Sequence, residues 1–205
     1  MKKLGSTDKL KHLSSNYEQF EELISKIDDM SKKGRVVIAI DGGSASGKTT
    51  LSELLSNIYE CTVIHMDYFF LQSHQRTKER FAEIGGNIDR ERFLEEVLIP
   101  LKKKDVINYR KFDCKSMTLS LFEQETIKSI IIIEGVYSMH PLFEEYYDLS
   151  VFLDVSTDLQ KTRIFKRNSL EYSKRFFDEW IPLENKYFNE MNVKERCKIV
   201  ILIKE

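Results

Sequence analysis

Small residues and one lysine between positions 42 and 50 carry the first recognisable chemistry of this chain. Residues 42–49 fit the pattern G-x-x-x-x-G-K-[ST], in which backbone N–H groups curl around a phosphate and the helix that follows adds its positive dipole end. Lys48 can reach β- and γ-phosphate oxygens, and the Thr49 hydroxyl is placed to bind Mg²⁺. The residues predicted to bind the nucleotide are Gly42, Gly43, Ser44, Ala45, Ser46, Gly47, Lys48, Thr49 and Thr50.

A strand and a helix must hold this loop in place. The β-branched run at residues 36–40 precedes it, and Leu51, Leu55 and Ile58 follow it at helical spacing. A glycine turn that binds nothing is the alternative interpretation. The strand before the loop and the helix after it favour a phosphate-binding loop (P-loop).

Two further apolar runs each lead to a carboxylate. Residues 62–66 precede Asp67, and residues 130–133 precede Glu134. Because ligands lie at the carboxyl ends of parallel strands, we expect Asp67 beside the bound phosphates as a general base, and Glu134 in the Walker B role, holding Mg²⁺ through a water. A cap or turn residue is the alternative for both. His65 shares a face with Asp67 and is predicted to be packed and hydrogen-bonded rather than catalytic.

Residues 150–154 and 198–203 supply two more apolar runs. Together with the three runs above, they predict an α/β fold in which five parallel strands alternate with helices. Between these two runs, residues 159–168 predict a helix on which Arg163 and Arg167 share one face. Two guanidinium groups there could stabilise charge on a transferring phosphate, and surface ion pairing is the alternative.

The remaining helices frame one domain. We expect this domain at residues 35–205, with a short lid around residues 163–175, and an amino-terminal extension at residues 1–34. The extension has apolar residues at helical spacing from Leu13 onward, which predicts an amphipathic helix packed on the domain; a partner-binding helix is the alternative. The aromatic-rich segment 173–191 is predicted to be helical and core-facing, with a kink or break at its proline.

The composition excludes several classes of function. Lysine and arginine number 32 against 33 acids, for a net charge of −1, so no global charge draws the chain to nucleic acid or to a membrane. No apolar run is long enough to span a bilayer and the first residues are polar, which predicts a cytoplasmic protein. The three cysteines and four histidines lack metal-binding spacing, which argues against a zinc enzyme.

Several segments, in this order, resemble the uridine kinase and phosphoribulokinase family. They are residues 42–50, Asp67-Tyr68-Phe69, Asn87-Ile88-Asp89, Phe112-Asp113, Glu134-Gly135 and the arginine-bearing helix after Asp154. The resemblance implies a three-layer P-loop NTPase fold with a nucleoside-monophosphate-kinase-like sheet. It also implies ATP and Mg²⁺ as the donor, a ribonucleoside 5′-hydroxyl as the acceptor, and assembly with further copies of the chain.

The same resemblance implies individual roles. Asp67 would be the general base with Tyr68 beside it, Asp89 would hold ribose hydroxyls, and Arg163 and Arg167 would belong to the lid, with Arg163 also reaching the acceptor. Uridine kinases typically carry a tyrosine and a histidine near the pyrimidine, and the corresponding acceptor-binding positions here are Phe112 and Met117. Because hydrogen-bonding sites discriminate better than apolar ones, the acceptor is less well specified than the donor.

We therefore predict an ATP-dependent kinase that phosphorylates a hydroxyl of a uridine- or cytidine-like nucleoside to give the 5′-monophosphate, with a small molecule as its partner. Alternative acceptors are pantothenate, nicotinamide riboside and a sugar phosphate, the last being favoured if the lysines at 102–104 faced the pocket. A regulatory module that binds ATP without being a kinase is the other alternative.

Overall fold

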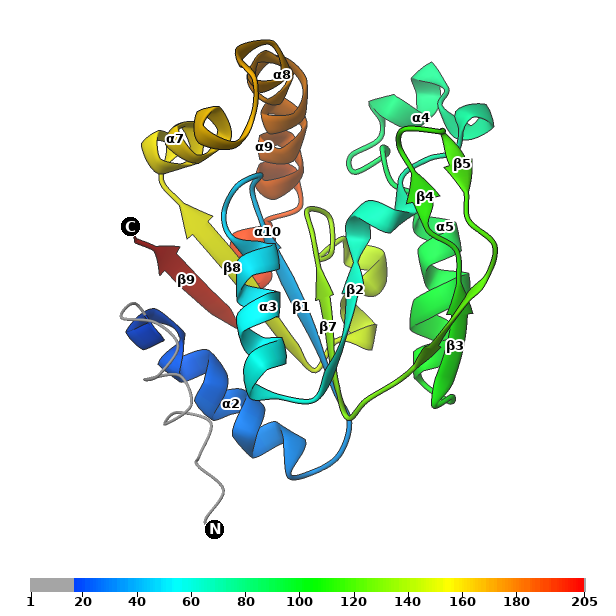
Figure 1. Ribbon diagram of the computed structural model, residues 1–205, viewed down its shortest axis with the longest axis vertical. Coiled ribbons are helices and arrows are strands. Elements are labelled where there is room, and N and C mark those ends of the chain that lie inside the picture. The colour runs from blue at the N-terminus through cyan, green and yellow to red at the C-terminus, as the bar shows by residue number, and fades with distance from the viewer. Residues whose placement is uncertain (1–16, 205) are drawn as a thin grey trace.

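The computed structural model describes residues 17–204 and contains a five-stranded parallel sheet (Figure 1). Its spatial order is β2-β7-β1-β8-β9, so the first strand of the chain lies at the centre. The predicted sheet is confirmed. Its strands are β1 (Val36–Gly42), β2 (Cys61–His65), β7 (Ile130–Glu134), β8 (Leu149–Val155) and β9 (Ile199–Ile203).

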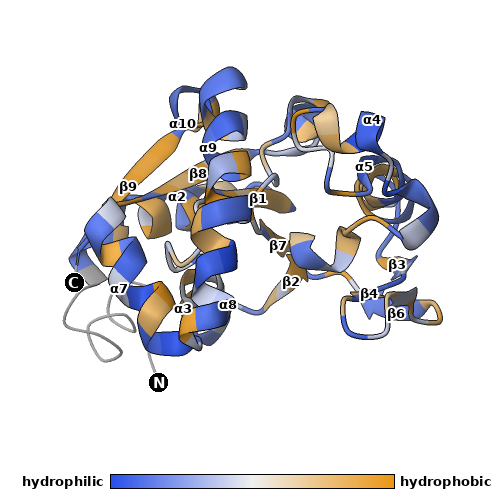
Figure 2. Cartoon of the chain, turned by 90° about the horizontal axis from the view of Figure 1, so that it is seen from above, coloured by the Kyte–Doolittle hydropathy of each residue, from blue (hydrophilic) through white to orange (hydrophobic). Residues whose placement is uncertain are grey.

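Helices cover both faces of the sheet (Figures 1 and 2). On one face, α2 (Glu21–Ser31) and α3 (Lys48–Ile58) pack against strand residues such as Ile38. On the other face, α9 (Ile181–Glu190) and the helical segment at 90–101 pack against alternate strand residues such as Val37. All seven residues of β1 are buried, as expected for a central parallel strand with helices on both sides.

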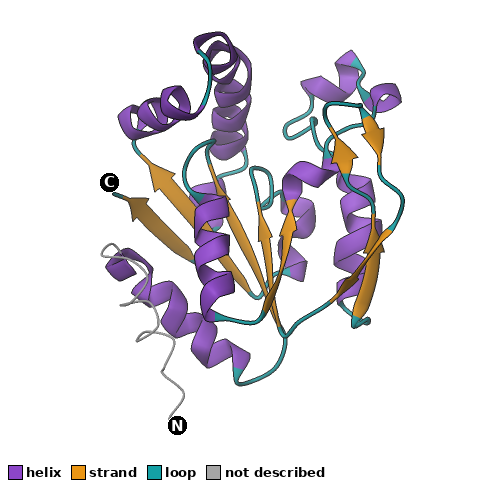
Figure 3. Ribbon diagram, in the orientation of Figure 1, coloured by secondary structure: helices purple, strands orange, loops and turns teal. Residues whose placement is uncertain are grey.

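The segment at 90–101 consists of α5 (Arg90–Phe93), the π-helix η4 (Leu94–Leu98) and α6 (Ile99–Leu101). Figure 3 shows the remaining short helices around the sheet. Their bounds are η1 (Tyr17–Phe20), η2 (Met66–Phe69), η3 (Ser73–Gln75), α4 (Lys78–Ala82), η5 (Pro141–Tyr146), α7 (Thr157–Arg167), α8 (Leu170–Arg175), the π-helix η6 (Phe176–Trp180) and α10 (Val193–Arg196). Within residues 17–204 no helix combines the length and the apolarity needed to cross a bilayer.

A small lobe stands beside the edge strand β2 (Figure 1). It contains two antiparallel pairs, β3 (Val106–Tyr109) with β6 (Glu123–Thr126), and β4 (Phe112–Asp113) with β5 (Thr118–Leu119). Strand β3 buries Ile107 and Tyr109, whereas β5 and β6 contain no fully buried residue.

Two expectations from the sequence need correction. The second strand ends at His65, and Asp67 lies in the 3-10 helix η2 rather than at the end of the strand. The aromatic segment is not broken at Pro182, because α8, η6 and α9 run on without a gap. Pro182 stands in the first turn of α9, directly after the π-helix η6, whose wider turn accommodates the missing N–H. The predicted start of the first helix near Leu13 lies outside the described residues.

Candidate active site

The P-loop connects β1 to α3 and depends on glycine at its first position. Gly42 has φ +146°, and a Cβ there would lie 2.6 Å from the carbonyl oxygen of Leu153, which real side chains do not tolerate. Gly47, with φ +103°, caps the start of α3. The loop therefore keeps its backbone N–H groups at the amino end of a helix, where a phosphate is favoured.

Lys48 turns back over the loop. Its ammonium donates hydrogen bonds to the carbonyl oxygens of Gly42 at 2.8 Å and Gly43 at 3.0 Å, and the residue is buried. Because a lysine ammonium has three donors, it can exchange a carbonyl for a phosphate oxygen without leaving the loop. Lys48 thus lies where the sequence places it, at the P-loop.

Oxygen ligands for a cation come together next to this lysine. The Thr49 hydroxyl donates to Glu134 Oε1 at 3.1 Å, and His65 Nδ1 lies 2.5 Å from the same oxygen. The hydroxyl and carboxylate suit Mg²⁺, which prefers oxygen ligands and keeps several waters. Within residues 17–204, no cluster of three or more His, Cys, Asp or Glu side chains could hold a metal, so phosphate oxygens and waters would have to complete the coordination. His65 fixes the Glu134 carboxylate, which in turn raises the pKa of His65.

Asp67 lies near these groups in η2. Water reaches the side chain, yet the protein packed around it raises the pKa of Asp67. The positive charges of Lys48 and His65 oppose this rise, and the negative charge of Glu134 adds to it. A carboxylate with a raised pKa is a better proton acceptor, so the environment suits Asp67 to the role of a base.

The arginines of α7 differ in their contacts. Arg163 donates to the carbonyl oxygens of Ala45 at 3.2 Å and Ser46 at 3.3 Å, and so links α7 to the P-loop. Arg167 is exposed, with its guanidinium 5.2 Å from the centre of the Phe176 ring, and its positive charge opposes the rise in the pKa of Asp67. Of the two, Arg167 is the one whose charge acts on the pKa of Asp67.

The Asp89 carboxylate is already occupied. It accepts hydrogen bonds from the backbone N–H of Arg92 at 3.2 Å and from Arg92 Nε at 3.2 Å, with both residues buried. Asp89 therefore caps α5. Arg92 also donates to the carbonyl oxygen of Tyr68 at 2.9 Å, which ties this pair to the residue after Asp67. The ribose-holding role of Asp89 stays a prediction.

Residues expected beside the acceptor lie on η2 and on the β4–β5 hairpin. Phe112 is buried, whereas Met117 is 37% exposed at the turn with φ +57°. The Lys111 ammonium lies 5.0 Å from the Tyr68 ring centre and pairs with Glu123 at 2.7 Å. Of the lysines at 102–104, Lys102 pairs with Glu145 at 3.3 Å and lies over the Tyr146 ring.

The sequence interpretation missed two buried carboxylates at the P-loop. Asp41 accepts hydrogen bonds from Gly42 N–H at 2.7 Å, Met139 N–H at 2.9 Å and the Tyr187 hydroxyl at 2.8 Å. Burial raises the pKa of Asp41 to about 6. Glu184 accepts a hydrogen bond from Ser44 N–H at 2.8 Å. Both were detectable as acids within an apolar pattern, Asp41 in a strand and Glu184 between aromatic residues at helical spacing.

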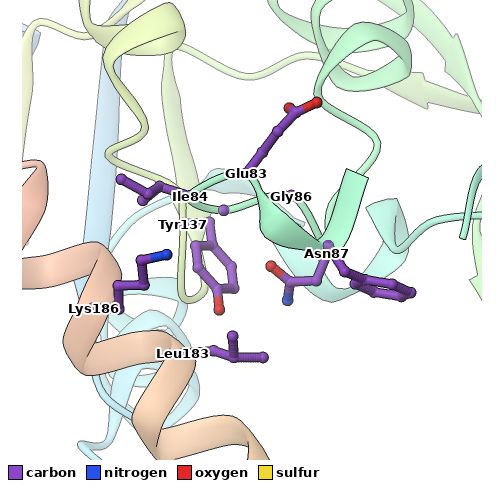
Figure 4. A pocket seen from close by; sticks show the side chains of 9 residues that line it. Glu83, Ile84, Gly86, Asn87, Tyr137, Leu183 and Lys186 are labelled. Carbon is purple, nitrogen blue, oxygen red and sulfur yellow. The ribbon is translucent and has the colours of Figure 1, made fainter. Parts of the chain in front are cut away.

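A recess lies between α9 and the loop at residues 83–87 (Figure 4). Tyr137 and Asn87 line one side, and Leu183 and Lys186 of α9 line the other. Tyr137 is buried and has φ +74°, unusual for a bulky residue. Such strain is found where the surrounding structure holds a residue in place.

Comparisons with known proteins agree with this geometry. A family model described as the Phosphoribulokinase / Uridine kinase family matches residues 37–172. A Uridine kinase from Bacillus thuringiensis (strain Al Hakam) is 26% identical over 170 residues, covering 74% of this chain and 79% of that protein. Uridine kinase-like protein 4 from Arabidopsis thaliana is 27% identical over 161 residues, covering 74% of this chain and 34% of that protein. The chain thus spans about a third of the length of its Arabidopsis relatives.

A solved structure described as a possible uridine kinase from Bacillus stearothermophilus has a TM-score of 0.63 and 23% identity, covering 88% of this chain and 99% of that one. This likeness shows that the two share a fold. The family model spans well over half of the chain and includes the P-loop, Asp67 and Glu134. The resemblance seen in the sequence is confirmed, and the chain belongs to the phosphoribulokinase / uridine kinase family.

Proposed function

We propose that this chain is an ATP-dependent kinase that transfers the γ-phosphate to a hydroxyl of a nucleoside or of a similarly small metabolite. The observation that carries this proposal is the gathering of Lys48, Thr49, Glu134 and Asp67 at the carboxyl end of the sheet. A P-loop alone would account for phosphate binding. The nearby carboxylate with a raised pKa adds the base that a phosphotransferase needs.

Each side chain then has one task. The P-loop amides hold the phosphates, and Lys48 neutralises the charge that develops on the transferring group. Thr49 and Glu134 would hold Mg²⁺, which would neutralise part of the negative charge on the transferring phosphate. Asp67 orients the acceptor hydroxyl and takes its proton. Arg167, on the lid helix, adds positive charge on the side of Asp67 and helps to exclude water.

The acceptor follows less directly from these residues. Phe112 is buried and apolar, and Met117 has no hydrogen-bonding donor, so polar recognition of a pyrimidine by these two positions is not supported. One cation on the acceptor side is Lys111, whose ammonium lies 5.0 Å from the centre of the Tyr68 ring. Uridine- and cytidine-like nucleosides remain the first choice because of the family, and pantothenate, nicotinamide riboside and sugar phosphates are the alternatives.

The test is ATP consumption with Mg²⁺ in the presence and absence of a panel of these acceptors. The proposal predicts turnover that depends on one acceptor class. Slow hydrolysis that no acceptor accelerates would refute the kinase and support a regulatory ATP-binding module.

A further inference from the structure

Glu184, on α9, binds the P-loop at Ser44. The residue is 4% exposed, one carboxylate oxygen accepts the Ser44 N–H at 2.8 Å, and the other accepts the Ser44 hydroxyl. A protein carboxylate therefore occupies a backbone donor of a loop whose purpose is to bind anions.

The Ser44 peptide is also held at its carbonyl group. Gln160 Nε2 of α7 donates to the Ser44 carbonyl oxygen at 2.8 Å. At the neighbouring Gly43, a Cβ would lie 2.9 Å from the same Gln160 nitrogen and 3.6 Å from Glu184 Oε2. Helices α7 and α9 thus bind the Ser44 peptide at its carbonyl oxygen and its N–H, and they pack closely against Gly43.

The charge of Glu184 adds to an already acidic surrounding. Burial raises the pKa of Glu184, the two hydrogen bonds from Ser44 and the charge of Lys48 oppose this rise, and the charge of Asp67 adds to it. Lys48 is the residue expected to meet the β- and γ-phosphates. A terminal phosphate at Lys48 would therefore experience repulsion from Glu184, which a nucleotide lacking that phosphate would avoid.

Helix α9 connects this contact to the recess in Figure 4, since Leu183 and Lys186 flank Glu184 in the sequence and line the recess. We propose that Glu184 is a positioning residue that senses the terminal phosphate: a nucleoside triphosphate, but not a diphosphate, displaces its carboxylate from Ser44 and frees α9 beside the recess. The proposal rests on the proposed function, in which the P-loop binds ATP.

The first test compares binding of ATP and ADP, with Mg²⁺ and without acceptor, by calorimetry on the wild-type protein, Glu184→Gln and Glu190→Gln. Glutamine keeps the size and one acceptor oxygen of Glu184, and Glu190 is an exposed acid on the same helix. We expect Glu184→Gln to raise the ratio of ATP affinity to ADP affinity on the order of 10-fold, since a negative charge near the phosphate-binding lysine is removed. Glu190→Gln should leave the ratio unchanged. An unchanged or lowered ratio in Glu184→Gln would overturn the proposal.

The second test uses Trp180, the single tryptophan, which packs against Phe176 at 4.5 Å just before α9. In the wild-type protein, saturating ATP should change the Trp180 fluorescence and ADP should not. In Glu184→Gln, ATP and ADP should give the same fluorescence. Equal responses to ATP and ADP in the wild-type protein would refute the release of α9. Failure of the proposed function would look different: no acceptor would accelerate ATP consumption, while the ratio of ATP affinity to ADP affinity could still be measured in each protein.

Discussion

The Tyr187 hydroxyl should stabilise the fold in a manner that depends on pH. It donates to the buried Asp41 carboxylate at 2.8 Å. Burial raises the pKa of Asp41 to about 6, against the lowering effects of the Met139 and Gly42 N–H groups, the Lys48 charge and this hydroxyl. Tyr187→Phe removes only the hydroxyl, since the ring contacts with Tyr137 at 4.8 Å and Phe188 at 5.3 Å can persist.

The size of the effect follows from the charge on Asp41. Above the pKa of Asp41, the Tyr187 hydroxyl donates to an ionised carboxylate. Removing this hydroxyl should therefore lower the unfolding free energy by about 1.5–3 kcal/mol. Below that pKa the acceptor is a neutral carboxyl in both proteins, and the loss should fall to about 0.5–1.5 kcal/mol. The stabilisation by the hydroxyl is therefore present at pH 8 and diminishes as the pH falls through about 6.

Urea unfolding at pH 8 and pH 5 measures both values. Tyr147→Phe is the matched control, because the Tyr147 hydroxyl donates at 2.8 Å to the neutral carbonyl oxygen of Ser138. Tyr147→Phe should lower the unfolding free energy by about 0.5–1.5 kcal/mol at both pH values. If Tyr187→Phe lowers the unfolding free energy equally at the two pH values, the inference that this tyrosine binds an ionised Asp41 is refuted.

Further predictions concern the active site. Lys48→Ala should weaken both ATP binding, measured by calorimetry, and phosphoryl transfer; wild-type values would remove Lys48 from the site. Glu134→Gln should raise the Mg²⁺ concentration needed for half-maximal activity by roughly 10–100-fold, and an unaltered Mg²⁺ titration would exclude its role at the metal. Because Asp67 must be deprotonated to act as a base and its pKa is raised, kcat/KM should increase with pH through a value above 3.8. A pH profile without an acidic limb would contradict this assignment.

The parallel sheet could be predicted because its strands carry an uninterrupted physical signal. Residues 130–134 are apolar up to Glu134 and form β7 with the expected bounds, since a strand covered on both faces needs apolar side chains on both. The antiparallel pairs of the small lobe have no such signal. Strand β6 (Glu-Gln-Glu-Thr) is mostly exposed, and its pairing with β3 is fixed by tertiary context.

The site was predictable where a residue follows directly from a motif, as Lys48 and Thr49 do. It was less predictable where distant segments meet. Glu184 lies 140 positions from Ser44, and no local pattern links them.

The π-helices η4 and η6 precede Pro100 and Pro182. Proline lacks the N–H that would bond four residues back, and a wider turn accommodates this loss, so the aromatic helix continues where the sequence indicated a break.

The central claim is that Asp67 activates an acceptor hydroxyl for transfer of the γ-phosphate. Its most direct test is acceptor-dependent ATP consumption by Asp67→Asn, with Asp178→Asn, an exposed acid on η6, as the matched control. We predict that Asp67→Asn lowers kcat by about 10²–10⁴-fold while ATP binding persists, and that Asp178→Asn keeps wild-type turnover. Full acceptor-dependent turnover by Asp67→Asn would contradict the account.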